Sequence, residues 1–359
     1  MPAIDNESSI RLRTLNFPLI VGVAYIHAFP TVIGFAGGTL GTHKLNLLTD
    51  FVRILVSQGV ARISVPLFFL MSGYFFFVGF KWSWQAYGGK LASRVRTLLV
   101  PYLFWTMLGV LIAYIGQSIP AVSAYFAGGG PRIADYSAFL LANAVLGLTQ
   151  APLSYHFWFI RDLMLLMILS PLIFVLLRYA ALPFIAAVFL AWITASWPIY
   201  TPDAVGVLFF SVGGYVALRG KSLFALDSYG PWFLLAYLPI LLADVIWNNA
   251  PFNTGLHRCG IVVGLVAILY ASKRALTCER LKNALLWLSG TSFFVYAAHV
   301  PLLGIVRTVA YRYIPLDWPY MILLLYLLLP MLVITCLVGL YHLLATITPR
   351  ALRTVTGGR

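Results

Sequence analysis

Ten long apolar stretches, separated by short polar segments, run through almost the whole chain. They occupy residues 15–33, 60–80, 97–117, 157–177, 181–199, 204–219, 231–247, 258–275, 285–306 and 320–346. A helix needs about 20 apolar residues to cross a bilayer, and in lipid it satisfies its own backbone hydrogen bonds. The sequence therefore predicts an all-α, polytopic membrane protein of about ten transmembrane helices, with residues 1–359 as a single integral-membrane domain.

The composition excludes several other classes of protein. Only 9% of the residues are charged and the mean hydropathy is +0.91, whereas a soluble globular protein carries roughly 25% charged residues. An ordinary soluble domain and a disordered chain are therefore excluded. The three cysteines, Cys259, Cys278 and Cys336, are isolated, with no CxxC or Cys/His ligand spacing. We expect neither a disulfide framework nor a metal site.

The formal net charge of +14 indicates how the helices are oriented. If the N-terminus is cytoplasmic, 16 of the 24 lysines and arginines fall on the cytoplasmic side and eight on the other side. Basic residues accumulate on the cytoplasmic side of membrane spans. The sequence thus predicts two cytoplasmic termini and an even number of spans. We expect membrane lipids rather than nucleic acid as partners, because no basic patch interleaved with aromatic residues lies outside the apolar stretches.

Several ionisable side chains lie within or at the mouths of the apolar stretches. Because such residues are costly in lipid, each is a functional candidate. Their similar predicted depth favours one polar cavity, open to the non-cytoplasmic side. The candidates are His27, Arg62, His156, Arg161, Asp162, Asp244 and His299.

Each candidate also has a structural interpretation. His27 and His299 can hydrogen-bond across helices, and His156 can anchor the chain at the membrane interface. Arg161 and Asp162 are adjacent, so they cannot face each other on one helix, and we expect them to pair with other spans.

Two further patterns have both a structural and a functional interpretation. In the second apolar stretch, Pro66 opens a kink, and the Ser72–Gly73 pair permits close helix packing or lines a cavity. Before the third stretch, Lys90, Arg94 and Arg96 form either a cluster that sets the topology or a site for a multiply charged anion such as phosphate.

These stretches together resemble a known family of membrane enzymes. The matching pieces are His27, Arg62 through Tyr74, Arg94-Val95-Arg96, His156 through Phe159 with Arg161-Asp162, Ser170-Pro171-Leu172, Leu288-Ser289-Gly290, Tyr296, and His299-Val300-Pro301. The chain is similar to acyltransferase family 3, the integral-membrane O-acyltransferases, and within it to the enterobacterial common antigen O-acetyltransferase type.

The resemblance implies a ten-helix domain of the bacterial inner membrane. Such a domain moves an acyl group, usually acetyl from acetyl-CoA, to a hydroxyl of a cell-surface carbohydrate. It also implies catalysis by His27 and binding of the acyl donor by Arg94 and Arg96. One position departs from the family, which often has a basic residue eleven positions before the histidine. Here that position is Asn16, so either Arg13 replaces the basic residue or the donor binds differently.

The resulting hypothesis assigns a role to each candidate. His27 acts as general base on the acceptor hydroxyl, and Arg62 or His299 stabilises the oxyanion. A transient acyl group on His27 or Ser72 stays open. Acetyl-CoA is the donor substrate and no metal is expected. The predicted substrate-binding residues are Ser72, His156, Trp158, Arg161 and Asp162.

A transporter or flippase for a lipid-linked sugar or a small anion is the alternative. It would use the same basic mouths and the same cavity without chemistry. Inverted internal repeats would favour it, and the sequence shows none.

Overall fold

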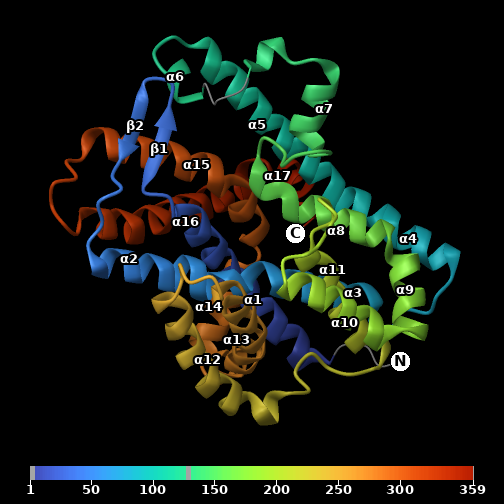
Figure 1. Ribbon diagram of the computed structural model, residues 1–359. Helices are drawn as coiled ribbons and strands as arrows, with labels where there is room; N and C mark the ends of the chain where they lie inside the picture. The colour runs from blue at the N-terminus through green and yellow to red at the C-terminus, as the bar shows by residue number, and fades with distance from the viewer. Residues whose placement is uncertain (1–4, 127–130, 359) are drawn as a thin grey trace. The chain divides into compact units, whose positions relative to one another are not determined.

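The computed structural model describes residues 5–126 and 131–358, and nearly all of its regular structure is helical (Figure 1). The chain divides into two compact units made of interleaved segments. The first unit comprises Met1–Ile26, Ile54–Arg94 and Asp162–Ser292. The second unit comprises His27–Arg53, Val95–Arg161 and Phe293–Arg359.

The first unit contains most of α1 (Asn6–Ala28) and a long series of further helices. These are η1 (Ile54–Gly59), η2 (Val60–Ile63), α3 (Ser64–Phe77), α4 (Trp84–Arg94), most of α8 (Trp158–Ile168), α9 (Ser170–Tyr179), α10 (Ala181–Ile193), α11 (Ala204–Leu218), η6 (Asp227–Tyr229), α12 (Gly230–Ile246), α13 (Asn253–Leu276) and α14 (Glu279–Ser289).

Helices α3 and α11 pack closely along each other because glycines lie at the crossing. A Cβ atom at Gly73 would lie 2.0 Å from the carbonyl oxygen of Phe210. A Cβ atom at Gly213 would lie 2.0 Å from the carbonyl oxygen of Leu70. No larger residue fits at either position without moving a backbone. The close approach predicted for the Ser72–Gly73 pair is confirmed.

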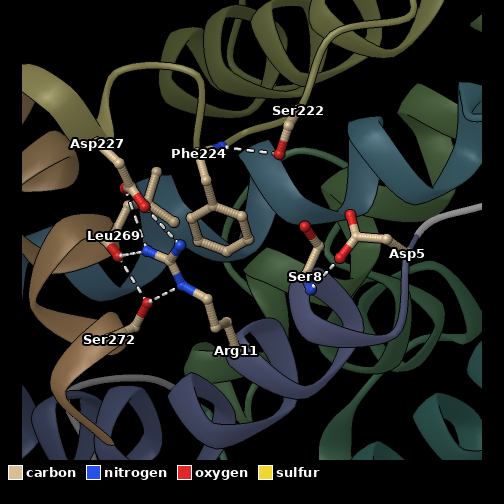
Figure 2. Close-up of polar contacts among 8 residues, drawn as sticks. All are labelled: Asp5, Ser8, Arg11, Ser222, Phe224, Asp227, Leu269 and Ser272. Atoms are coloured by element: carbon tan, nitrogen blue, oxygen red, sulfur yellow. Dashed lines mark hydrogen bonds and ion pairs between the residues drawn. The ribbon is translucent and has the colours of Figure 1, made fainter. Parts of the chain in front are cut away.

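A buried arginine joins α1 to two other segments of the first unit (Figure 2). The Arg11 guanidinium donates to both carboxylate oxygens of Asp227, at 2.5 and 3.1 Å, and its carbon lies 3.6 Å from the ring centroid of Phe224. It also donates to the carbonyl of Leu269 at 2.7 Å and to the hydroxyl of Ser272 at 3.1 Å. Arg11 is only 3% exposed. It therefore holds α1 against α13 and the turn before α12.

The second unit contains the last two residues of α1, a β-hairpin and the C-terminal helices. Its elements are β1 (Val32–Phe35), β2 (Gly38–Gly41), α2 (Leu47–Arg53), η3 (Val95–Leu99), α5 (Val100–Ser118), α6 (Ser123–Phe126), η4 (Ile133–Asp135), α7 (Ala138–Leu146), η5 (Tyr155–Phe157), the first turn of α8, α15 (Ser292–Tyr313), α16 (Met321–Ile347) and α17 (Pro349–Val355).

The hairpin of the second unit pairs antiparallel strands, with Val32 opposite Gly41. Ile33 and Leu40 of the hairpin pack against a buried cluster that includes Tyr311 of α15 and Leu325 of α16. The predicted first span, residues 15–33, is therefore too long, because the helix ends at Ala28 and residues 32–35 form a strand.

Six helices are long and apolar enough to cross a membrane, counting the residues that the structure describes. They are Leu47–Phe77, Trp84–Ser118, Asp227–Ile246, Asn253–Leu276, Ser292–Tyr313 and Met321–Ile347. The pair Tyr155–Ile168 and Ser170–Tyr179, bent by 65°, is a candidate seventh span. Two shorter apolar helices, α10 and α11, match further predicted stretches. Every predicted stretch therefore contains helix, while the count of about ten spans stays a prediction.

The second predicted stretch begins earlier than expected and is irregular. The candidate span starts at Leu47 and includes residues 54–59 as a π-helical turn and residues 60–63 as a 3₁₀ turn before α3. Such turns break the regular pattern of backbone hydrogen bonds and frequently occur at functional positions. The irregularity lies directly before Pro66.

Candidate active site

Three of the predicted histidines meet inside the second unit. The ring centroids of His27 and His299 are 5.3 Å apart, and those of His156 and His299 are 5.4 Å apart. The centroids of His27 and His156 are 6.3 Å apart. The three side chains come from the end of α1, from η5 and from α15, more than 120 residues from one another in sequence. The folded second unit thus forms one imidazole cluster, which we call the histidine cluster.

The backbone of α15 determines which ring nitrogen of neutral His299 carries the hydrogen. Nδ1 of His299 lies 2.7 Å from the carbonyl oxygen of Tyr296 and 3.2 Å from that of Val295. A carbonyl oxygen only accepts hydrogen bonds, so in the neutral ring Nδ1 carries the hydrogen and Nε2 carries a lone pair. His299 is fully buried, and its Nε2 has no partner among residues 5–126 and 131–358. A buried acceptor is therefore left available to a bound molecule.

His156 has the same arrangement with its ring nitrogens exchanged. Its Nε2 lies 3.2 Å from the carbonyl oxygen of Ala297, so the lone pair of the neutral ring is on Nδ1. Within the described part of the chain, this buried Nδ1 also lacks a partner. The hydroxyl of Tyr296 donates to the carbonyl of His156 at 2.7 Å. Two successive residues of α15 therefore hold the segment that carries His156.

His27 forms the more accessible side of the cluster. Its Nδ1 lies 3.1 Å from the hydroxyl of Tyr155. His27 is half-buried and Tyr155 is 45% exposed, whereas His156 is 2% exposed. In many enzymes, a third group orients the catalytic base by a hydrogen bond, and the Tyr155 hydroxyl is placed to do this for His27. The cluster therefore runs from an accessible imidazole to two buried ones, and a reactant can approach from the side of Tyr155.

The chemistry of this cluster is that of proton transfer and hydrogen-bond acceptance. A neutral imidazole accepts a proton or a hydrogen bond at the ring nitrogen that carries the lone pair. No group of three or more His, Cys, Asp or Glu residues that could hold a metal ion occurs among the described residues.

Besides Asp162, the first unit contains four of the candidate residues: Arg62, Ser72, Arg94 and Asp244. Nε of Arg62 donates to the side-chain oxygen of Gln58 at 2.8 Å, one helical turn earlier. Ser72 is half-buried beside the glycine crossing of α3. The Nε atom of Arg94 is buried and without a partner in the described residues. The Asp244 carboxylate of α12 lies 2.8 Å from Nδ1 of His257 of α13.

Arg161 and Asp162 hydrogen-bond to connecting segments, and the expectation that they pair with other spans stays a prediction. Arg161 donates to the carbonyl of Gly147 at 2.6 Å, at the end of α7. Asp162 is fully buried and accepts from the hydroxyl of Thr201, at 2.8 Å, and from the backbone N–H of Asp203, at 2.7 Å. The two side chains thus bond to different segments, as expected for adjacent residues on a helix. Their role as substrate-binding residues stays a prediction.

The remaining predicted residues lie in the second unit. Trp158 is half-buried at the start of α8, directly after the segment that carries His156. Arg96 is exposed in the π-helical turn before α5.

From the sequence, no role was assigned to Tyr155, Tyr296 or Arg307, each of which hydrogen-bonds to His27 or His156 in the structure. The available signals were weak. Tyr155 directly precedes His156, and Arg307 follows His299 by two turns on the same helix. Their partners are a histidine ring and backbone carbonyls, which leave no spacing motif in the sequence.

Comparison with known proteins identifies the family. A family described as an acyltransferase domain, acyltransferase 3, matches residues 17–341, which is most of the chain. The chain belongs to the acyltransferase 3 family. With its apolar helices, this membership makes it a multi-pass membrane acyltransferase. The predicted family is thus confirmed, while the finer enterobacterial common antigen type stays a prediction.

A curated relative aligns over nearly the full length. The succinoglycan biosynthesis protein ExoH of Rhizobium meliloti (strain 1021) is 24% identical over 364 residues. The alignment covers 99% of this chain and 94% of that protein. No solved structure matches this acyltransferase significantly.

Proposed function

We propose that this protein is an O-acyltransferase that moves an acetyl group from cytoplasmic acetyl-CoA to a hydroxyl of a cell-surface or lipid-linked carbohydrate. The histidine cluster is the observation that carries the proposal. Two buried imidazole nitrogens without described partners are suited to accept hydrogen bonds from a polyhydroxylated molecule. Membership of an acyltransferase family supports the acyl group, and the relative named for succinoglycan biosynthesis supports a carbohydrate acceptor.

His27 is the general base of the proposed reaction. The acceptor hydroxyl oxygen attacks the thioester carbonyl carbon, a C–O bond forms, and the hydroxyl proton passes to the imidazole. Collapse of the tetrahedral intermediate breaks the C–S bond, and the imidazolium returns the proton to the departing thiolate of CoA. The bond to Tyr155 orients the ring for these two transfers. The products are an O-acyl ester and free CoA.

His156 and His299 are assigned to the acceptor. In the neutral tautomers that their carbonyl contacts require, the second ring nitrogen of each carries a lone pair rather than an N–H. Such nitrogens accept hydrogen bonds from sugar hydroxyls. The same tautomer makes His299 less suited to stabilising an oxyanion, a role that needs a donor. Arg62 is retained as the candidate for that role.

Arg94 and Arg96 are assigned to the acyl donor. Arg94 has a buried Nε without a described partner, and Arg96 is exposed. Guanidinium groups that lack a carboxylate partner are suited to the phosphates of CoA. This assignment requires both residues to be cytoplasmic, as CoA is. We therefore also propose about ten spans, two cytoplasmic termini and a location in the bacterial inner membrane.

Purified protein in lipid nanodiscs, with acetyl-CoA and an acceptor glycan, tests the proposal. CoA release and ester formation are measured for His27→Ala and for His43→Ala, which removes an exposed histidine of the same unit. We expect His27→Ala to lower the rate by about 100-fold or more, as removal of a general base does. His43→Ala keeps the normal rate. Undiminished transfer in His27→Ala contradicts the assignment of His27 as the base. If the unaltered protein never releases CoA, the proposed acyltransferase activity with acetyl-CoA is contradicted.

A further inference from the structure

Arg307 holds the chain at the point where His27 leaves α1. Its Nη1 lies 3.2 Å from the carbonyl oxygen of His27 and 3.3 Å from that of Pro30. One guanidinium from α15 therefore contacts the backbone of the proposed base on both sides of the helix end.

A second arginine holds the same short segment. Nη2 of Arg53 lies 2.5 Å from the carbonyl oxygen of Phe29, and its guanidinium carbon lies 4.4 Å from the centroid of the Phe29 ring. Arg53 is 4% exposed and also forms an ion pair with Asp50 at 3.1 Å. The carbonyls of three residues among positions 27–30 are thus held by arginines from α2 and α15.

The end of a helix explains why cations gather here. The last carbonyl groups of an α-helix have no partner within the helix, and the helix dipole places negative partial charge there. Arg53 and Arg307 satisfy this end of α1. Arg53 has a carboxylate partner, whereas within the described chain Arg307 has no ion pair with a carboxylate. Arg307 is therefore the arginine whose main described contacts are with the end of α1 itself.

We propose that Arg307 is the positioning residue of His27. By bonding the carbonyls on both sides of the α1 end, it fixes the backbone from which the imidazole projects toward Tyr155 and His299. The inference rests on the proposed function, because it assigns Arg307 a role that acts through the proposed base. A small displacement of a catalytic group is enough to lower the rate by about 100-fold.

The test uses the full-length protein in nanodiscs and three substitutions. Arg307→Gln removes the charge and the planar set of guanidinium N–H donors. Arg307→Lys keeps the charge with fewer donors. Arg312→Gln changes an exposed arginine of the same helix and is the matched control. We expect Arg307→Gln to lower kcat by about 10- to 100-fold, with the KM for acetyl-CoA unchanged within about twofold. Arg307→Lys recovers part of kcat, and Arg312→Gln equals the unaltered protein.

Three outcomes overturn the inference. The first is an Arg307→Gln variant with the kcat of Arg312→Gln, and the second is a raised KM at unchanged kcat, which indicates a binding residue. If Arg307→Gln does not accumulate as folded protein, the kcat of Arg307→Lys is used instead. An unchanged kcat in Arg307→Lys is then the third outcome that overturns the inference. If His27→Ala is fully active, the proposed function fails instead. An inactive His27→Ala beside a normal Arg307→Gln refutes only the positioning role.

Discussion

The Arg11 site of the first unit and the histidine cluster of the second unit are both buried polar groups in a largely apolar protein. Arg11 makes four hydrogen bonds to three residues and lies over an aromatic ring (Figure 2). In the histidine cluster, one nitrogen each of His156 and His299 is buried without a described partner. A satisfied polar group stabilises a fold, whereas an unsatisfied one costs free energy and is retained where a ligand completes it.

The comparison changes how Arg11 is interpreted. From the sequence, Arg13 was the candidate to replace the basic residue that the family often has at the position of Asn16, and Arg11 lies two residues before Arg13. Because the Arg11 guanidinium is engaged by Asp227, Leu269 and Ser272, it is not available to an acyl donor. Arg13, which is exposed, stays the candidate for that replacement.

The largest effect is expected when the unsatisfied cluster is altered. His299→Ala removes a hydrogen-bond acceptor that positions the acceptor sugar, and we expect it to lower acyl transfer by about 100-fold while the protein remains folded. Specific activity and the thermal unfolding midpoint of the purified variant measure the two effects separately. A His299→Ala variant that is fully active but unstable would show that His299 stabilises the fold, as Arg11 does, and the contrast between the two sites would then be wrong.

A smaller effect, on stability, is expected when the satisfied site is altered. Arg11→Met leaves the Asp227 carboxylate without its partner, and breaking a buried ion pair costs about 3 kcal/mol. We expect a lower yield of folded protein and a lower thermal midpoint, with nearly normal activity per folded molecule. Arg13→Met is the control, because Arg13 is exposed. Normal stability in Arg11→Met would show that the network in Figure 2 does not anchor α1.

The glycine crossing of the first unit provides an apolar reference for this comparison. Gly73→Ala places a Cβ against the carbonyl of Phe210, and overpacking of this kind costs about 2 kcal/mol. Gly79→Ala is not a suitable control, because Gly79 has a positive φ of 65°. Gly88→Ala is suitable, since nothing lies within 4 Å of its position. Thermal midpoints that are equal for Gly73→Ala and Gly88→Ala would contradict the close packing of α3 on α11.

The smallest effect is expected at the start of α1. The backbone N–H of Ser8 donates to the Asp5 carboxylate at 2.8 Å, and this bond lowers the pKa of Asp5 below its ordinary value of 3.8. A lowered pKa means that the stabilisation is present above pH 3.8 and is lost as the pH falls through the pKa of the folded state. Asp5→Ala should therefore lower the thermal midpoint slightly at pH 7, by loss of an N-cap. The difference should shrink as the pH falls below 3.8 and vanish below the pKa of Asp5 in the folded state, and a difference that persists once Asp5 is protonated would exclude the carboxylate as its source.

Much of the fold was predictable from the sequence, because lipid leaves few alternatives to helix. Each predicted stretch contains helix, and His27, His156 and His299 were identified from the cost of placing ionisable groups among apolar residues. The hairpin at residues 32–41 was not predicted, since its residues continue the apolar pattern of the first stretch. The start of the second span at Leu47 was also missed, because Asp50 and Arg53 interrupt the apolar pattern. In the structure these two residues form an ion pair, which offsets their charges.

The contacts around the histidine cluster could not be read from residue types. Arg307 and Arg53 bind backbone carbonyls, and every residue has a carbonyl, so no sequence pattern marks the partner. The tautomers of His156 and His299 depend on which carbonyl each ring faces. Asp162 was a candidate because it is ionisable and lies at the mouth of an apolar stretch, whereas its bonds to Thr201 and Asp203 follow from the folded chain and leave no pattern in the sequence.

Acyl transfer per folded molecule, measured side by side for His27→Ala and Arg11→Met, tests the central claim most directly. The account predicts that His27→Ala is folded, with a normal thermal midpoint, and loses CoA release from acetyl-CoA by about 100-fold. It predicts that Arg11→Met is less stable but turns over acetyl-CoA at nearly the normal rate. An active His27→Ala variant, with the ester still formed on the acceptor, would contradict it.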